Sequence, residues 1–369
     1  KNEPAKRKGV KTAQTIWQAK KACPDLVLLP AHHGKYRQYS KLANEVYERY
    51  TDLVEPFGID ESWLDLTGSL HLFGGDARQT ADEIRAVMKA ELGLSLSIGV
   101  SFNKVFAKLG SDYRKPDATT VISRENYRAL VWPLPVSDLL FVGATTARLL
   151  ERHGIRTIGE LAACPPEILE TLLGKHGVQL YQYATGEEHS QVHPASHRPM
   201  PKSVGNGTTF QKDLEGWEEI WTGASMLADR VGERLRRYGL ACTAVQVTVR
   251  DPHFRDKSRQ RRLACPTNLS REILRTAMEL IKELWQEWDP VRSITVTALN
   301  LLPEGESGEQ MDLFDPGRSG QHERQARLEQ TVDRLRGKYG RGAIRFGGGA
   351  ELGAGGKKQG AVEKVEEEA

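Results

Sequence analysis

Hydrophobic and polar positions are arranged most regularly between residues 204 and 303. In residues 217–238 apolar side chains recur at helical spacing, which marks one buried helix face. Val245, Val247 and Val249 instead alternate with polar residues, as in a half-buried strand. By the same criteria we expect strands near residues 204–211, 258–265 and 293–301, and a helix at residues 270–288. The predicted order, β-α-β-β-α-β, is that of the split βαβ fold.

The first 132 residues alternate helix-like and strand-like segments and predict one α/β module. Helices are expected within residues 11–48, separated by a short strand at Leu26–Leu29. Two strand-like runs then flank Asp60 and Glu61, which predicts a β-hairpin with both carboxylates near its turn. The remaining predicted elements are a helix at 80–92, a strand at 95–101 and a helix at 103–113.

The segments outside these two regions differ in composition and in hydrophobic pattern. Residues 133–189 predict short helices joined by tight glycine turns, and the Pro- and His-rich residues 190–201 predict a linker. Beyond residue 303 a polar loop precedes a helix near residues 321–339. The Gly-rich and then charged tail is expected to be disordered.

Composition adds that charge is segregated along the chain. The 369 residues carry a net charge of only +3 and suit more than one domain. Residues 49–91 hold nine acids and four bases, whereas residues 230–262 hold ten bases and three acids. Four scattered cysteines suit a reducing cytoplasm, and no apolar run approaches the ~20 residues of a membrane span. The pattern is compatible with an acidic catalytic module beside a surface that holds a polyanion, and ordinary surface charge is the alternative.

The stretch GIDESWLDLTGS (58–69) carries the first candidate chemistry. Adjacent carboxylates at a turn can face hard cations, and Mg²⁺ prefers a few carboxylates together with substrate phosphates and water. Two such ions clamp the attacking and leaving oxygens of a phosphoryl transfer. Asp60 and Glu61 are therefore candidate metal ligands, although an Asp-Glu pair alone is more often a solvated turn.

The second stretch with candidate functional residues is SIGVSFNKVFAKLGSDYRKPD (97–117). A strand runs into a helix with Lys104 and Lys108, and Lys115 follows directly before Pro116. A lysine beside a rigid proline is a candidate clamp for a polyphosphate, and an ordinary surface lysine is the alternative.

In order and spacing, these two stretches together resemble the palm motifs of the Y-family DNA polymerases, specifically the DNA polymerase IV branch. The resemblance covers roughly residues 1–303. It implies that Asp60 and Glu61 are the family's second and third metal-binding carboxylates, holding two Mg²⁺ per active site. It also implies that Lys115 and Lys6 contact the nucleotide triphosphate, whereas Asp65 is structural.

The resemblance extends to the expected DNA contacts. FVGATTARLLERHGIRTIGELA (141–162) looks like a helix-hairpin-helix, in which Gly143 would face a DNA phosphate. KSVGNGTTF (202–210) matches the entry into the family's little finger. The resemblance implies that this module contacts mostly the sugar-phosphate backbone of DNA, through Ser203, Arg250, Arg259 and Arg261. Each of these contacts would contribute affinity that salt removes.

A separate peptide, EQMDLFDP (309–316), resembles those by which polymerases hold the sliding clamp. Gln310, Leu313 and Phe314 would fill a small partner pocket. The alternative is a hydrophobic plug against the chain's own surface.

We therefore expect an α+β fold with right-hand polymerase architecture: palm, partial fingers, helix-hairpin-helix thumb and split-βαβ little finger. The expected boundaries are 1–28 partial fingers, 29–132 palm, 133–189 thumb, 190–201 linker, 202–303 little finger, 304–320 clamp-binding loop and 321–369 helix and tail. The family's first palm strand, with its Asp and its bulky residue, has no match here. We therefore expect the chain to lack that strand and to be impaired, because a two-metal site without one carboxylate binds Mg²⁺ poorly.

The resemblance implies a low-fidelity, template-directed DNA polymerase for translesion synthesis. The expected partners are primer-template DNA, deoxynucleoside triphosphates and the sliding clamp, without a membrane. We expect a monomer in the cytoplasm, near the nucleoid. One alternative is a non-catalytic polymerase-like adaptor, favoured by the unmatched first strand but opposed by the retained Asp60, Glu61 and Lys115. The other is a DNA-binding module, which predicts that Asp60→Ala leaves every measurable function intact.

Overall fold

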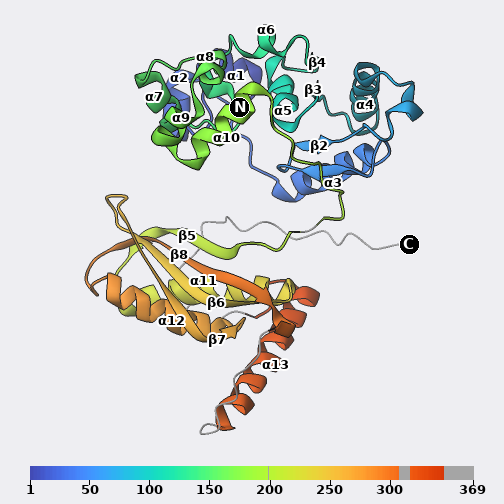
Figure 1. The fold of residues 1–369 in the computed structure, drawn as a ribbon. Helices are drawn as coiled ribbons and strands as arrows, with labels where there is room; N and C mark the ends of the chain where they lie inside the picture. The colour runs from blue at the N-terminus through green and yellow to red at the C-terminus, as the bar shows by residue number, and fades with distance from the viewer. Residues whose placement is uncertain (198, 307–315, 345–369) are drawn as a thin grey trace. The chain divides into compact units, whose positions relative to one another are not determined.

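The computed structural model describes residues 1–197, 199–306 and 316–344. The chain forms two compact units, Lys1–Arg198 and Pro199–Ala369 (Figure 1). Their boundary falls in the segment predicted to be a linker. In the described residues no helix is long and apolar enough to cross a membrane.

The first unit contains the predicted hairpin. Strand β1 (Val54–Pro56) pairs antiparallel with β2 (Ser62–Leu64), so the hairpin prediction is confirmed. The N–H groups of Phe57 and Gly58 both donate to the Glu61 carbonyl, at 2.9 and 3.2 Å, and close the turn. The turn therefore projects Asp60 and Glu61 from the end of a short, rigid ladder.

A parallel pair of strands supports the neighbouring helix. Strand β3 (Ile98–Ser101) pairs with β4 (Thr119–Ile122), and helix α5 (Lys104–Tyr113) is the crossover between them. A Cβ on Gly99 would lie 1.9 Å from the Ala107 carbonyl oxygen, so only glycine lets α5 pack this closely on β3. The sequence analysis missed β4, because four residues rich in threonine after a Pro-containing loop give no periodic signal.

The expected strand at Leu26–Leu29 is wrong. These residues form no strand, and Val27 and Leu29 are 79% and 84% exposed. A strand needs a hydrogen-bonding neighbour as well as an apolar run, and none pairs with this segment in the described chain. The helices around it are α1 (Glu3–Arg7), α2 (Ile16–Ala22), α3 (His33–Tyr47) and, after the hairpin, the short η1 (Leu70–Phe73) and α4 (Ala77–Leu92).

Short helices complete the first unit. They are α6 (Tyr127–Val131), η2 (Val136–Asp138), α7 (Ala144–Arg152), α8 (Ile158–Ala163), α9 (Pro166–Leu173) and α10 (Lys175–Thr185). All of them except α6 lie in residues 133–189, where short helices were predicted. Phe106 and Leu109 of α5 share one hydrophobic core with buried residues of these helices, such as Leu150 and Leu169. Helix α5 is thus held on one side by β3 and on the other by this core.

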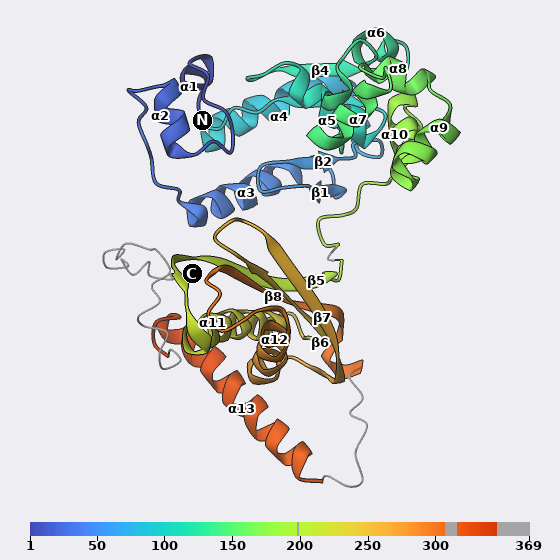
Figure 2. The ribbon, with the colours of Figure 1, turned by 90° about the vertical axis from the view of Figure 1, so that its left-hand side faces the viewer.

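The second unit is a four-stranded antiparallel sheet with two helices on one face (Figures 1 and 2). Its elements in chain order are β5 (Ser203–Leu214), α11 (Gly216–Arg237), β6 (Leu240–Arg250), β7 (Asp256–Thr267), α12 (Ser270–Leu284) and β8 (Val291–Pro303). The predicted β-α-β-β-α-β order is confirmed, and the spatial order is β5-β8-β6-β7. Val245, Val247 and Val249 face the helices and form the core with them.

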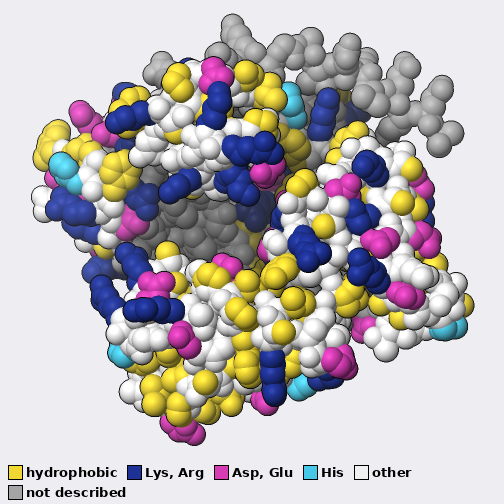
Figure 3. Space-filling model, turned by 90° about the horizontal axis from the view of Figure 1, so that it is seen from above, with side chains coloured by type: hydrophobic (Ala, Val, Ile, Leu, Met, Phe, Trp, Pro, Cys, Tyr) yellow, Lys and Arg dark blue, Asp and Glu magenta, His cyan; other side chains and the backbone are white. Residues whose placement is uncertain are grey.

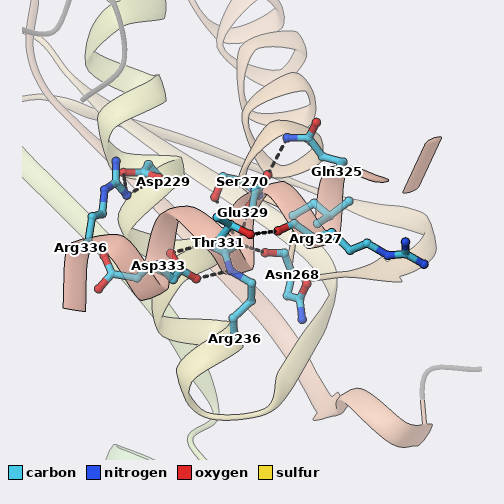
Figure 4. Close-up of polar contacts among 12 residues, drawn as sticks. Asp229, Arg236, Asn268, Ser270, Gln325, Arg327, Glu329, Thr331, Asp333 and Arg336 are labelled. Carbon is cyan, nitrogen blue, oxygen red and sulfur yellow. Dashed lines mark hydrogen bonds and ion pairs between the residues drawn. The ribbon is translucent and has the colours of Figure 1, made fainter. Parts of the chain in front are cut away.

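A third helix contacts this unit through ion pairs. After η3 (Glu304–Glu306), α13 (Pro316–Tyr339) confirms the predicted helix near 321–339, and Figure 2 shows it on the side of α11 and α12. Arg236 of α11 pairs with Glu329 and Asp333 of α13, and Arg336 of α13 pairs with Asp229 of α11 at 2.8 Å (Figure 4). The residues of the predicted clamp peptide, Gln310, Leu313 and Phe314, and the predicted disordered tail lie outside the described residues.

Candidate active site

The two candidate metal ligands differ in their surroundings. Asp60 is exposed at the hairpin turn, whereas Glu61 is partly buried with its side chain 37% exposed. Glu61 Oε1 lies 2.7 Å from Nζ of Lys108, which comes from the middle of α5. The structure thus brings one predicted ligand against the helix of the second motif.

A chain of alternating charges continues from Lys108 to Lys115. Lys108 Nζ also lies 2.8 Å from Oδ2 of Asp112, and Asp112 Oδ1 lies 2.5 Å from Nζ of Lys115. Burial alone would lower the pKa of Lys108, but its hydrogen bonds to Asp112 and Glu61 raise the pKa above its ordinary value. Burial would raise the pKa of Asp112, and the two lysines hold that pKa below its ordinary value. Lys108 and Asp112 are therefore charged at neutral pH.

The loop that carries Lys115 is held by α4. Arg85 Nη2 donates to the Asp117 carboxylate at 2.7 Å, and Lys89 lies 3.1 Å from the same carboxylate. Asp117 adopts a left-handed φ of 53°, which Asp tolerates better than most residues. The hydrogen bond from Arg85 lowers the pKa of Asp117, which keeps the carboxylate charged and the loop attached.

Sequence reasoning missed Lys108, Asp112 and Arg85 as site residues. A signal for the first two was present, because Lys108, Asp112 and Lys115 are spaced by four and three residues on and just beyond a predicted helix. No local signal identifies Arg85, which reaches Asp117 from 32 positions away.

The back of the hairpin is fixed by a second ion pair. Glu55 Oε2 lies 2.7 Å from Lys104 Nζ and accepts the His193 N–H at 2.8 Å. The Lys104 ammonium also lies 5.1 Å from the centre of the Trp63 ring, whose N–H donates to the Lys104 carbonyl at 3.0 Å. Lys104 is therefore a support for the hairpin and not a free cation of the site.

This pair makes the stability of the first unit sensitive to acid. Burial would raise the pKa of Glu55, but Lys104 and the His193 N–H hold it below its ordinary value of 4.5. A lowered carboxyl pKa contributes stability above the ordinary value, which is lost as pH falls through the lowered one. As pH falls from about 5 to 3, we expect the free energy of unfolding to decrease less in Glu55→Gln than in the parent. Urea unfolding at a series of pH values measures this, and equal acid slopes would contradict it.

The available carboxylates fit a magnesium ion that takes some of its ligands from the protein and the others from substrate and water. Asp60 and Glu61 offer hard carboxylate oxygens, and in the described chain no group of three or more metal-ligating side chains gathers. Mg²⁺ commonly binds one or two carboxylates and completes its octahedron with phosphate oxygens and water. Two carboxylates at an accessible turn, with a lysine network beside them, satisfy that requirement.

Two other predicted contacts lie apart from this group. Lys6 is on α1, 3.6 Å from Glu3, and within the described residues no ion pair or hydrogen bond joins it to Asp60, Glu61 or Lys115. Gly143 caps the N-terminus of α7, and among the described residues no atom outside its two chain neighbours lies within 4 Å of a Cβ built on it. The backbone there is open to a large ligand, which a DNA phosphate contact requires.

The sheet of the second unit places the predicted arginines on different faces. Arg259 and Arg261 stand opposite Val247 and Val245 on β6, so they point to the helix-covered side. Arg259 lies 2.9 Å from Glu283 of α12, and Arg261 lies 2.6 Å from Glu279. This geometry gives both arginines a partner within the unit, and their role as DNA ligands remains a prediction.

The other face of the sheet is open and polar. Arg250 lies on it, 2.6 Å from Asp256, and Ser203 begins its edge strand. Arg262 shares this face, together with polar side chains that the sequence did not indicate: Gln246, Thr248, Ser258, Gln260, Thr295 and Thr297. A Cβ on Gly207 would lie 2.3 Å from Thr295 Oγ1, so glycine is needed for the hydroxyls to pack against β5.

Charge on the molecular surface is mixed in sign. On the face drawn in Figure 3, Lys and Arg side chains are interspersed with Asp and Glu. This face therefore carries no surface of a single sign.

Comparison with known proteins agrees with this arrangement. Residues 1–112 match the impB/mucB/samB family, and residues 201–313 match the C-terminal domain of that family. DNA polymerase IV of Acetivibrio thermocellus is 41% identical over 347 residues, which cover 94% of this chain and 86% of the relative. DNA polymerase IV 1 of Bacillus subtilis is 36% identical over 343 residues, covering 93% and 81%.

The fold is shared with a solved structure. A Y-family DNA polymerase chimera superimposes with a TM-score of 0.72 at 20% identity, covering 82% of this chain and 86% of the chimera. The predicted α+β polymerase fold is thereby confirmed. Together with the sequence identities, it shows that the chain belongs to the impB/mucB/samB family, on the DNA polymerase IV branch of the Y-family DNA polymerases.

Proposed function

We propose that this chain is a template-directed, translesion DNA polymerase whose active centre is built on the Asp60–Glu61 turn. The observation that carries the proposal is the link from Glu61 through Lys108 and Asp112 to Lys115. It joins a carboxylate suited to Mg²⁺ to a lysine suited to a triphosphate. In the reaction, the primer 3′-hydroxyl attacks the α-phosphorus of a deoxynucleoside triphosphate, and pyrophosphate leaves.

Each side chain has a distinct task in this proposal. Asp60 and Glu61 would hold two Mg²⁺, which when bound supply Lewis-acid stabilisation of the reacting oxygens. Lys115 orients the triphosphate by donating to its oxygens, and Lys108 balances the charge of Glu61. Lys6 is a candidate second triphosphate contact, and Gly143 at the start of α7 would offer backbone N–H groups to a DNA phosphate.

We propose the open face of the second unit as the surface that binds duplex DNA. Hydroxyl and amide side chains there can donate to phosphate oxygens without reading sequence. A polymerase that copies any template needs contacts of this sequence-independent kind. Ser203 and Arg250 belong to this face, together with the threonines of β8.

The two faces predict different effects of neighbouring arginines. Arg262→Gln removes an exposed cation from the open face, so we expect primer-template affinity to fall by about three- to tenfold and the salt slope by about 1. Arg261→Gln removes a cation that lies on the helix-covered side and is paired with α12, so we expect a smaller loss than for Arg262→Gln. Fluorescence anisotropy across a salt series measures both. Equal losses would contradict the assignment of faces.

The remaining partners are proposals of the same kind. Sliding-clamp binding through Gln310, Leu313 and Phe314 remains a prediction. We also propose that the chain acts as a monomer near the nucleoid.

Primer extension tests the proposed function. We would measure it with Mg²⁺ and four deoxynucleotides, on this chain and on a form with the family's Asp-bearing strand fused upstream. Template-dependent extension by either form, abolished by Asp60→Ala, is the expected result. If neither form extends a primer yet both bind primer-template DNA, the adaptor alternative replaces the polymerase. Among the described residues no group of three or more metal-ligating side chains gathers, and this observation keeps the adaptor alternative in the design.

A further inference from the structure

We propose that Asp112 is a positioning residue for nucleotide binding, which sets the ammonium groups of Lys108 and Lys115 at a fixed separation. The inference rests on the proposed function, because it assigns Lys115 to the triphosphate. It adds that a carboxylate, not a further cation, determines where that lysine points.

The contacts of Asp112 support this role. Its two carboxylate oxygens are used separately: Oδ2 lies 2.8 Å from Lys108 Nζ, and Oδ1 lies 2.5 Å from Lys115 Nζ. Lys108 is only 17% exposed and also contacts Glu61, whereas Lys115 is 53% exposed and has Asp112 as its one ion-pair partner in the described chain. Through these ion pairs Asp112 links Lys115 to the Lys108–Glu61 pair, and so the proposed triphosphate contact to a proposed metal ligand.

The backbone around Asp112 is rigid enough for such a role. Gly99 lets α5 pack directly on β3, and Phe106 anchors the opposite side of the helix in a core. The loop after Lys115 is attached to α4 through Asp117 and Arg85. With both ends of the loop fixed, a carboxylate on the last turn of α5 restricts the lysine side chain to few rotamers.

Restricting Lys115 matters because lysine is flexible. A free lysine side chain loses considerable rotamer entropy when it is immobilised on a ligand. An ammonium has three N–H donors, so Lys115 can keep one on Asp112 and direct two at phosphate oxygens. Prior restriction by Asp112 therefore lowers the entropic cost of nucleotide binding.

The test is nucleotide affinity without turnover. Primer-template DNA ending in a dideoxynucleotide is mixed with the complementary deoxynucleoside triphosphate and Mg²⁺, and the Kd is measured by fluorescence titration. We expect Asp112→Asn to raise this Kd about tenfold and Asp112→Glu to restore most of the affinity. DNA affinity should stay unchanged. As a matched control, Glu45→Gln removes an exposed partner of Lys41 at the same four-residue spacing and should leave the Kd unchanged.

A double-mutant cycle with Lys115→Gln decides the mechanism. If Asp112 acts through Lys115, then Asp112→Asn changes the Kd little once Lys115 is replaced. Equal effects of Asp112→Asn in both backgrounds would overturn the inference, and so would an unchanged Kd in Asp112→Asn itself. If the parent binds no nucleotide, or if Lys115→Gln binds as well as the parent, the assignment of Lys115 fails, which is a failure of the proposed function and is distinguishable from the other two.

Discussion

Asp60→Ala is expected to lower primer extension by about three orders of magnitude or more while changing primer-template affinity less than about twofold. The side chain lies exposed at the hairpin turn, where no buried contact depends on it. Losing a carboxylate that holds a metal removes several kcal/mol of stabilisation from the transition state, and each 1.4 kcal/mol is about tenfold in rate. The proposed DNA contacts lie on the second unit and at Gly143, so we expect binding to persist.

A second aspartate from the same motif provides the matched control. Asp65 Oδ1 accepts the Thr67 N–H at 2.9 Å and so closes the turn after β2. We expect Asp65→Asn to keep extension within about tenfold of the parent, because it can lose a turn contact but no metal ligand. Single-turnover extension of the parent and both variants would be compared in whichever form extends primers. Full extension activity of Asp60→Ala would refute its role as a metal ligand.

Arg236→Met is expected to destabilise the second unit by about 3–5 kcal/mol. The Arg236 side chain is 8% exposed and contacts Glu329, Asp333 and the Asn268 carbonyl (Figure 4). Removing the guanidinium leaves two acidic groups in a buried setting without their cation, which costs more than the pair itself contributes. The apolar core of the unit includes no described residue of α13, so this helix is held mainly by polar contacts, among them the Arg236 pairs and the ion pair that Arg336 makes with α11.

Arg261 is the control because it also contacts two carboxylates, Glu279 and Glu283, but at the surface. We expect Arg261→Met to cost less than about 1 kcal/mol, since exposed ion pairs contribute little. Urea unfolding gives the free energies, and hydrogen exchange of the α13 amides shows whether this helix undocks. Equal and small effects of the two substitutions would mean that α13 is not held by the Arg236 pairs.

Local patterns were sufficient for elements whose own residues carry the signal. The hairpin at Asp60 and Glu61 and the β-α-β-β-α-β order were predicted correctly, because alternation and helical spacing reflect which face of each element is buried. Strand β4 and the absence of a strand at Leu26–Leu29 were not predicted. Both depend on whether a neighbouring strand is present to pair, and a short segment carries no information about its neighbour.

The sequence by itself determined the family, the carboxylate pair at a turn and the lysine beside a proline, since these are contained in contiguous motifs. The tertiary structure alone decided which charges meet. Strand β7 is polar from Asp256 to Arg262, so its sequence does not reveal which of its residues face α12; only pairing with β6 turns Arg261 inward and Arg262 outward. Likewise, Lys108 pairs with Glu61, which is 47 positions away in the sequence, because α5 packs beside the hairpin. Charge pairing depends on distances in space, which hydrophobic periodicity does not encode.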